Sequence, residues 1–198
     1  MNIKRIVIVG AGAVAVGGCI GGLLCESGSN VALVARGEHG KKIRNEGLNV
    51  KFPNRVAFCK PDCFESVDAV DWKTDDVCLI ATKLNDAEQV LDQLLAAAGA
   101  GIPVICTFNG MQGEQWATER FDTVATIMIW MPSTHLFPGD VRVCFFIVDL
   151  CCFDWPAIRR SKIPRKTKVS KQYAAAWIGR AKFSILAFKL PKLPNCCR

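Results

Sequence analysis

Two glycines separated by one residue, Gly10 and Gly12, follow a run of β-branched residues at 6–9. The run is typical of a buried parallel strand, and the apolar segment after the glycines suits a helix. A glycine pair in this context permits a tight turn and lets the backbone approach a pyrophosphate at the N-terminus of the helix. The third position of this dinucleotide fingerprint is Ala15, an allowed substitute. A tight turn without a ligand is the alternative. The predicted cofactor-binding loop consists of Gly10, Ala11, Gly12, Ala13, Val14 and Ala15.

Arg36 ends the next predicted strand and indicates which dinucleotide binds. An acidic residue at this position would accept a hydrogen bond from the 2′-hydroxyl of the adenosine ribose. A guanidinium instead matches the oxygens of a 2′-phosphate in pairs, and Lys41 and Lys42 follow closely. The sequence therefore predicts NADP(H) rather than NAD(H). A solvated surface arginine is the alternative.

Strand-like and helix-like segments alternate along the first 143 residues. The strands predicted after the glycine loop are 30–35, 77–82, 102–108 and 123–131. The helix after the glycines is predicted to end near residues 27–29, and further helices are predicted at 38–46, 87–98 and 112–121. Residues 48–73 are ambiguous. This alternation predicts an α/β fold, a Rossmann-like doubly wound parallel sheet with right-handed crossovers.

Charge divides the chain near residue 143. Residues 1–143 contain 13 Lys and Arg against 16 Asp and Glu, whereas residues 144–198 contain 12 against 2. The total of +7 therefore joins a mildly acidic body to a strongly basic tail. We predict two parts: an NADP-binding domain at 1–143, and at 144–198 an irregular, basic, Cys-containing tail. A content of 51% hydrophobic and 22% charged residues excludes disorder of the whole chain.

The eleven cysteines are odd in number and irregular in spacing, so they do not indicate a secreted disulfide framework. They favour a reducing compartment, and we predict a cytoplasmic protein. His39 and His135 are isolated, so no metal site is predicted. Residues 6–25 carry no charge and could be a signal peptide or membrane helix. Six glycines and a β-branched start oppose that interpretation, and no membrane association is expected.

Five segments taken together resemble the N-terminal domain of ketopantoate reductase (2-dehydropantoate 2-reductase). They are residues 10–14, 31–39, 43–48, 81–83 and 108–111. The resemblance extends over about residues 3–143. It implies hydride transfer from NADPH to the ketone of a 2-oxo acid, in pantothenate biosynthesis.

The resemblance also implies two residues near the nicotinamide and the substrate. Lys83 matches the family's lysine after the fourth strand, where a cation attracts the substrate carboxylate. Asn109 matches the asparagine of the family's Asn-Gly turn. The alternatives are a solvated lysine at a strand end and a simple tight turn.

The chain departs from the family pattern at two places. Ala15 and Val16 are additional before Gly17, and two added helical residues rotate the remainder of the helix by about 200°. Either the turn absorbs them or the glycine face packs differently. The second departure is the proton donor, a lysine on a separate helical domain that the family has where this chain has its basic tail. Prolines at 191 and 194 oppose a helix around Lys189 and Lys192, so no donor lysine is assigned.

The leading hypothesis is an NADP(H)-binding oxidoreductase that resembles ketopantoate reductase and has little or no turnover, with a truncated or frame-shifted end. One alternative is a non-catalytic binding or regulatory module whose basic tail contacts an anionic partner. Seven cations lie between Arg159 and Lys171. We favour a solvated tail over nucleic-acid binding. Another alternative is a reductase of a different 2-oxo acid. The sequence does not predict the oligomeric state.

Overall fold

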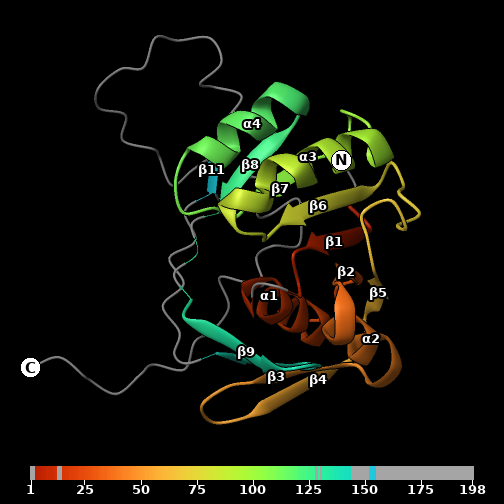
Figure 1. Ribbon diagram of the computed structural model, residues 1–198, viewed down its shortest axis with the longest axis vertical. Helices are drawn as coiled ribbons and strands as arrows, with labels where there is room; N and C mark the ends of the chain where they lie inside the picture. The colour runs from red at the N-terminus through yellow and green to blue at the C-terminus, as the bar shows by residue number, and fades with distance from the viewer. Residues whose placement is uncertain (1–2, 13–14, 128, 130, 144–151, 155–198) are drawn as a thin grey trace, which may run out of the picture.

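The computed structural model describes residues 3–12, 15–127, 129, 131–143 and 152–154. Seven strands form the larger sheet in the order β11-β8-β7-β6-β1-β2-β5 (Figure 1). Their bounds are β1 (Arg5–Val9), β2 (Val31–Val34), β5 (Asp62–Phe64), β6 (Asp76–Ile80), β7 (Val104–Cys106), β8 (Val124–Ile127) and β11 (Cys152–Asp154). All neighbouring pairs are parallel except β11 with β8. The predicted Rossmann-like parallel sheet is confirmed.

Four helices connect and cover these strands. They are α1 (Ala15–Glu26), α2 (Gly37–Glu46), α3 (Leu84–Ala98) and α4 (Gln112–Arg120). Helices α3 and α4 pack together on one face of the larger sheet, and α1 lies on the other (Figure 1). Alternate residues of β1, such as Ile8 and Val9, belong to the two different cores. This strand is therefore buried on both faces, as its unbroken apolar sequence predicts.

A second, four-stranded sheet in the order β4-β3-β10-β9 was not predicted. Its strands are β3 (Leu48–Lys51), β4 (Val56–Cys59), β9 (Ser133–Phe137) and β10 (Asp140–Val143). The ambiguous segment 48–73 thus contains two strands of this sheet as well as β5. The smaller sheet depends on the parallel pairing of β3 with β10, with Val50 beside Val141. Partners so distant in sequence leave no local signal.

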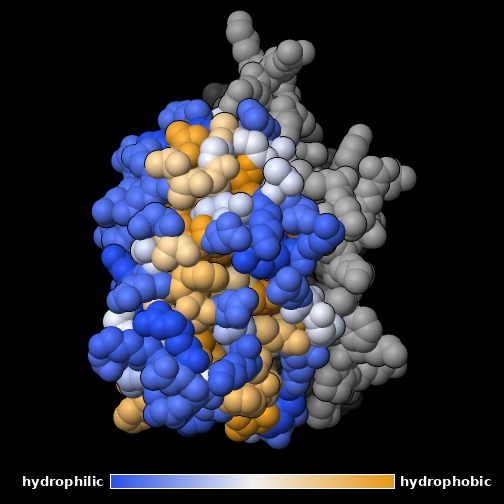
Figure 2. All heavy atoms as spheres, turned by 90° about the vertical axis from the view of Figure 1, so that its right-hand side faces the viewer, coloured by the Kyte–Doolittle hydropathy of each residue, from blue (hydrophilic) through white to orange (hydrophobic). Residues whose placement is uncertain are grey.

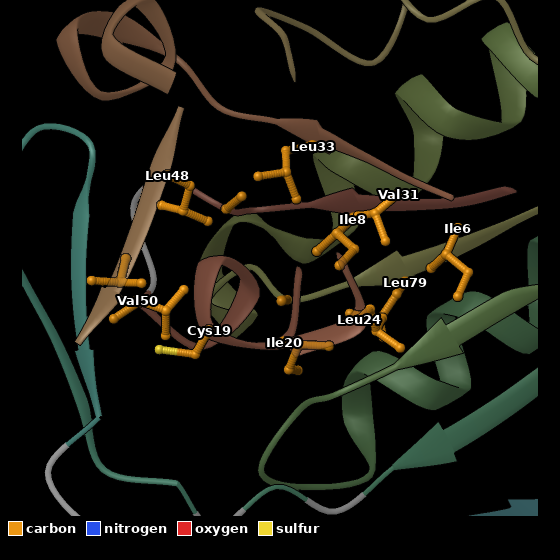
Figure 3. Close-up of a cluster of buried hydrophobic side chains, with 14 of the residues drawn as sticks. Ile6, Ile8, Cys19, Ile20, Leu24, Val31, Leu33, Leu48, Val50 and Leu79 are labelled. Carbon is orange, nitrogen blue, oxygen red and sulfur yellow. The ribbon is translucent and has the colours of Figure 1, made fainter. Parts of the chain in front are cut away.

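Helix α1 lies between the two sheets (Figure 1). Its side chains face Leu48 and Val50 of the smaller sheet and Ile8 and Leu33 of the larger one (Figure 3). A Cβ on Gly21 would lie 2.7 Å from a Leu33 methyl carbon, and one on Gly22 would overlap Val50. The glycines therefore allow both sheets to approach the helix.

The surface beside α2 and β5 is mostly hydrophilic (Figure 2). Figure 2 shows the side of the molecule that carries α2 and β5, where hydrophilic residues cover much of the surface around a broken apolar band. No helix within the described ranges is both long and apolar enough to cross a membrane.

Of the predicted basic tail, the structure describes only Cys152–Asp154, which forms β11. The predictions for Lys189 and Lys192 and for the cations between Arg159 and Lys171 lie outside the described residues.

Candidate functional site at the carboxyl edge of the larger sheet

The carboxyl ends of the parallel strands meet at one edge of the larger sheet. Val9 lies beside both Val34 and Ile80, and Ile80 lies beside Cys106. The chain proceeds from β1 outward to β2 on one side and returns to β6 on the other. The edge between β1 and β6 is therefore a topological switch point, where open α/β sheets bind ligands.

The glycine turn leaves β1 at this switch point. Gly10 has a φ of +101°, a conformation that favours glycine, and a Cβ there would lie 2.7 Å from the Ala81 carbonyl group. The N–H groups of Gly10 and Ala11 both donate to the Val34 carbonyl, at 3.3 and 3.2 Å. The turn is thus held against the ends of both neighbouring strands.

Gly17 makes the close approach between α1 and this turn. A Cβ at Gly17 would lie 3.0 Å from the Gly10 carbonyl oxygen, a contact typical of the third fingerprint glycine. Ala15 begins α1 and is buried in the core beside β1. Ala13 and Val14, also predicted to bind the cofactor, lie outside the described residues. Despite the two added residues, the glycines of α1 still pack closely against the sheets.

Arg36 occupies the N-cap position of α2, just after β2, and is exposed. No ion pair of Arg36 is found within the described ranges. Lys41 instead pairs with Glu38 at 2.8 Å, and Lys42 pairs with Glu46 at 2.6 Å. Among the three cations near this end of β2, Arg36 is therefore the one that pairs with no carboxylate in the described part of the chain.

Thr82 and Lys83 follow β6 on the opposite side of the glycine turn. Thr82 packs closely against the glycine turn, since a Cβ on Gly10 would lie 2.8 Å from the Thr82 backbone nitrogen. The Thr82 hydroxyl oxygen is buried and has no hydrogen-bond partner among the described residues. Lys83 is exposed at the N-cap position of α3. Sequence reasoning missed Thr82. An orphaned hydroxyl beside a glycine turn suits a polar ligand.

Asn109 and Gly110 form the turn between β7 and α4. Asn109 is exposed, and Gly110 has a φ of +138°. The turn is anchored by Thr107, which donates to the Ile80 carbonyl from its backbone N–H at 3.2 Å and its hydroxyl at 2.8 Å. The predicted residues Lys83 and Asn109 therefore follow adjacent strands at the same edge.

Glu114, in the first turn of α4, is a second residue that sequence reasoning missed. It is only 2% exposed, and neither carboxyl oxygen has a hydrogen-bond partner within the described ranges. Burial raises the pKa of this carboxyl group. The available signal was an acidic residue shortly after an Asn-Gly turn.

His39, which the sequence left as an isolated histidine, is buried on α2. Its ring lies 4.0 Å from the ring of His135 on β9, in an edge-to-face arrangement. Burial and the neighbouring His135 lower the pKa of His39 to about 4, while the Ala11 backbone and Asp140 act in the opposite direction. His39 is therefore neutral at pH 7. No group of three or more potential metal ligands occurs in the described part of the chain.

The parallel sheet, its switch point and the glycine turn define a Rossmann-like domain. A family model described as "Ketopantoate reductase PanE/ApbA" matches residues 6–146. The chain belongs to this family of oxidoreductases, as the resemblance implied. No curated protein matches the chain in sequence.

Several solved structures share the fold. The PanE/ApbA family ketopantoate reductase of Ralstonia eutropha JMP134 is 24% identical, with a TM-score of 0.63 over 70% of this chain and 46% of that one. The 2-dehydropantoate 2-reductase of Geobacter metallireducens GS-15 is 22% identical, with a TM-score of 0.68 over 90% and 56%. D-mandelate dehydrogenase, solved with NADH and anilino(oxo)acetate, is 24% identical, with a TM-score of 0.62 over 70% and 45%. The chain thus spans about half the length of the first relatives that it matches.

Proposed function

We propose that this chain is the NADP(H)-binding part of a reductase that acts on a 2-oxo acid of the ketopantoate type. The observation that carries the proposal is the position of the glycine turn, Arg36, Lys83 and Asn109, which follow neighbouring strands at one edge of the sheet. Membership of the ketopantoate reductase family supports the same chemistry.

The residues at the switch point suit a dinucleotide. The turn from Gly10 to Gly12 and the start of α1 would hold the pyrophosphate, because backbone N–H groups and the helix dipole favour an anion there. The orphaned Thr82 hydroxyl would provide a hydrogen bond to the cofactor beside this turn. Arg36 would bind the 2′-phosphate, since no carboxylate in the described part of the chain pairs with its guanidinium.

When bound, NADPH supplies the hydride for reduction of the ketone. Lys83 would attract the carboxylate of the 2-oxo acid, and the Asn109 amide would orient cofactor and substrate by hydrogen bonding. No proton donor is assigned among the described residues, and general acid catalysis typically contributes about 10²–10⁴-fold. We therefore expect the 198-residue chain to bind NADPH with little or no turnover.

A second candidate is a reductase of another 2-oxo acid that uses NAD(H). D-mandelate dehydrogenase, solved with NADH, matches this fold with nearly the same TM-score as the ketopantoate reductases. Arg36 favours the first candidate, because an NAD-binding site usually has an acidic residue at this position.

Fluorescence titration of the full chain with NADPH and with NADH tests the cofactor part of the proposal. We expect saturable binding that is tighter for NADPH, and absence of saturable NADPH binding would refute it. NADPH oxidation with ketopantoate, beside NAD⁺ reduction with D-mandelate, then tests the substrate. Turnover at a normal enzyme rate would contradict the expected lack of a proton donor.

Lys83→Ala tests the substrate role of the lysine. It should weaken ketopantoate binding to the complex of the chain with NADP⁺ and leave NADPH affinity nearly unchanged. Lys73→Ala is the matched control, because Lys73 is an exposed lysine just before the opposite end of the same strand, β6. Equal effects of the two substitutions would assign Lys83 no specific role.

A further inference from the structure

The thiols of Cys25 and Cys59 lie beside each other where α1 packs against β4, and the Cys59 thiol donates a hydrogen bond of 3.8 Å to the Leu48 carbonyl. Cys25 lies in the last turn of α1, and Cys59 ends β4, an outer strand of the smaller sheet. Both side chains are half-buried. The close packing around them includes Gly22, where a Cβ would lie 3.9 Å from the Cys59 sulfur.

The buried cysteines of the described part of the chain have no such access to solvent. Cys78 and Cys106 lie in the core between the larger sheet and the helices α3 and α4, and burial raises the pKa of both thiols. Burial also raises the pKa of Cys63. Reactive cysteines need thiolate character and access to the reagent, so these three are expected to be inert.

We propose that Cys25 and Cys59 are an oxidative modification site that forms a reversible disulfide in the presence of hydrogen peroxide. A disulfide joins two cysteines whose side chains face each other across packed elements, as these two do on α1 and β4. The inference is independent of the cofactor, because Cys25 lies at the end of α1 opposite the glycine turn, about 15 Å along the helix.

The surrounding charges assign different roles to the two sulfurs. The neighbouring Cys59 thiol lowers the pKa of Cys25, and partial burial opposes this effect. The neighbouring Cys25 thiol, burial and the negative charges of Cys25 and Glu26 raise the pKa of Cys59, whose S–H donates to the Leu48 carbonyl. Glu26 is itself paired with Arg55. Cys25 is therefore the attacking thiolate and Cys59 the resolving thiol.

The reaction takes place in two balanced steps. The Cys25 thiolate attacks one peroxide oxygen, the O–O bond breaks, and the departing hydroxide takes a proton to leave as water. Cys25 is then a sulfenic acid. The Cys59 sulfur attacks the Cys25 sulfur, the S–O bond breaks, and the proton of Cys59 leaves with the hydroxide as a second water. Two thiols are oxidised to one disulfide, and one peroxide is reduced to two waters.

Peptide mapping of the full chain after peroxide treatment tests the proposal. We expect a peptide pair joined through Cys25 and Cys59, lighter by two hydrogen atoms than the reduced pair and separated again by dithiothreitol. Cys63→Ser is the matched control, because Lys60 precedes Pro61 and trypsin leaves Cys59 and Cys63 on one peptide. The link should persist in Cys63→Ser and disappear in Cys25→Ser and Cys59→Ser.

Trapping of the intermediate distinguishes the two roles. In Cys59→Ser, dimedone should label Cys25 as its sulfenic acid, whereas in Cys25→Ser it should leave Cys59 unlabelled. A disulfide that joins another pair of cysteines, or oxidation of Cys25 to sulfinic acid without a link in the unsubstituted chain, would overturn the proposal. Labelling of Cys59 in Cys25→Ser would contradict the assigned order of attack.

Discussion

The backbone N–H of Gly139 donates a hydrogen bond of 3.0 Å to Nδ1 of His39. This bond connects the turn between β9 and β10 to α2, and so joins the smaller sheet to the helix that follows β2. Its acceptor nitrogen must be unprotonated. The contact between the two parts of the domain is therefore coupled to the protonation state of one buried imidazole.

Stability should fall as the pH decreases from 6.5 towards 4. The pKa of His39 is lowered from 6.5 to about 4 in the folded protein, so the unfolded chain binds the additional proton in this interval. The stabilisation is complete above pH 6.5 and lost as the pH falls through about 4. The shift corresponds to about 3 kcal/mol, measurable by urea unfolding at several pH values.

Two substitutions separate titration from hydrogen bonding at His39. The side-chain oxygen of His39→Asn can accept from Gly139 but does not titrate, so this variant should retain stability at pH 7 and lose the dependence between pH 6.5 and 4. His39→Leu leaves the Gly139 N–H unpaired and should lose about 1–3 kcal/mol at pH 7. An unchanged pH dependence in His39→Asn would assign the effect to other groups.

Gly22→Ala should destabilise the domain although alanine is the better helix former. Helix propensity favours the substitution by about 1 kcal/mol. The new methyl group would overlap Val50 on the smaller sheet, however, and overpacking of this kind costs about 1–3 kcal/mol. Gly101→Ala is the control, because nothing lies within 4 Å of its Cβ position. The midpoints of urea unfolding of the two variants and the unsubstituted chain measure the effect. A higher midpoint for Gly22→Ala would contradict the packing of α1 between two sheets.

Removal of the carboxylate of Asp76 should lower the free energy of unfolding strongly. Its two oxygens accept from Nε and a terminal nitrogen of Arg5 at 2.9 and 2.6 Å, and its side chain is fully buried. Asp76→Ala leaves the Arg5 charge without this partner, at a cost of about 3–5 kcal/mol in unfolding free energy. The double variant Arg5→Met/Asp76→Leu should recover part of the loss. Asp75→Ala, which breaks only the exposed pair with Lys4, should have little effect.

Glu114→Gln should make the protein more stable at neutral pH. Because burial raises the pKa of Glu114 in the folded state, the folded protein retains its proton more strongly than the unfolded chain. The associated stability is complete below the ordinary value of 4.5 and is lost as the pH rises through the folded pKa. Melting temperatures of Glu114→Gln and of the unsubstituted chain, measured from pH 4 to 8, test this: the variant should melt at the higher temperature at neutral pH. Glu119→Gln, on the exposed surface of the same helix, should melt in parallel with the unsubstituted chain.

The five central strands of the larger sheet could be predicted because their signals are local, whereas its outer strands β5 and β11 were not predicted. The run at 6–9, the stop at Gly47 and the apolar spacing of α3 each depend on neighbouring residues, and α2 ends before Gly47 with a φ of +91°. The smaller sheet could not be predicted, because the backbone N–H and C=O groups of β3 form hydrogen bonds with those of β10, about 90 residues later in the chain. Arg36 was predicted from its position after a strand, whereas Lys83 and Asn109 were predicted from the family resemblance. Thr82 and Glu114 were missed because burial without a partner becomes visible only in three dimensions. The contacts of His39 with His135 and Gly139 were missed because they join segments about 100 residues apart.

Calorimetric titration of NADPH and NADH into the unsubstituted chain and into Arg36→Ala tests the central claim most directly. A charge-assisted hydrogen bond to phosphate contributes about 1.5–3 kcal/mol, so NADPH affinity should fall about 10- to 100-fold while NADH affinity barely changes. Arg55→Ala, an exposed arginine on the turn before β4, should leave both affinities unchanged. Loss of the preference for NADPH in Arg36→Ala alone is the predicted result. Saturable binding of neither dinucleotide by the unsubstituted chain would contradict the account.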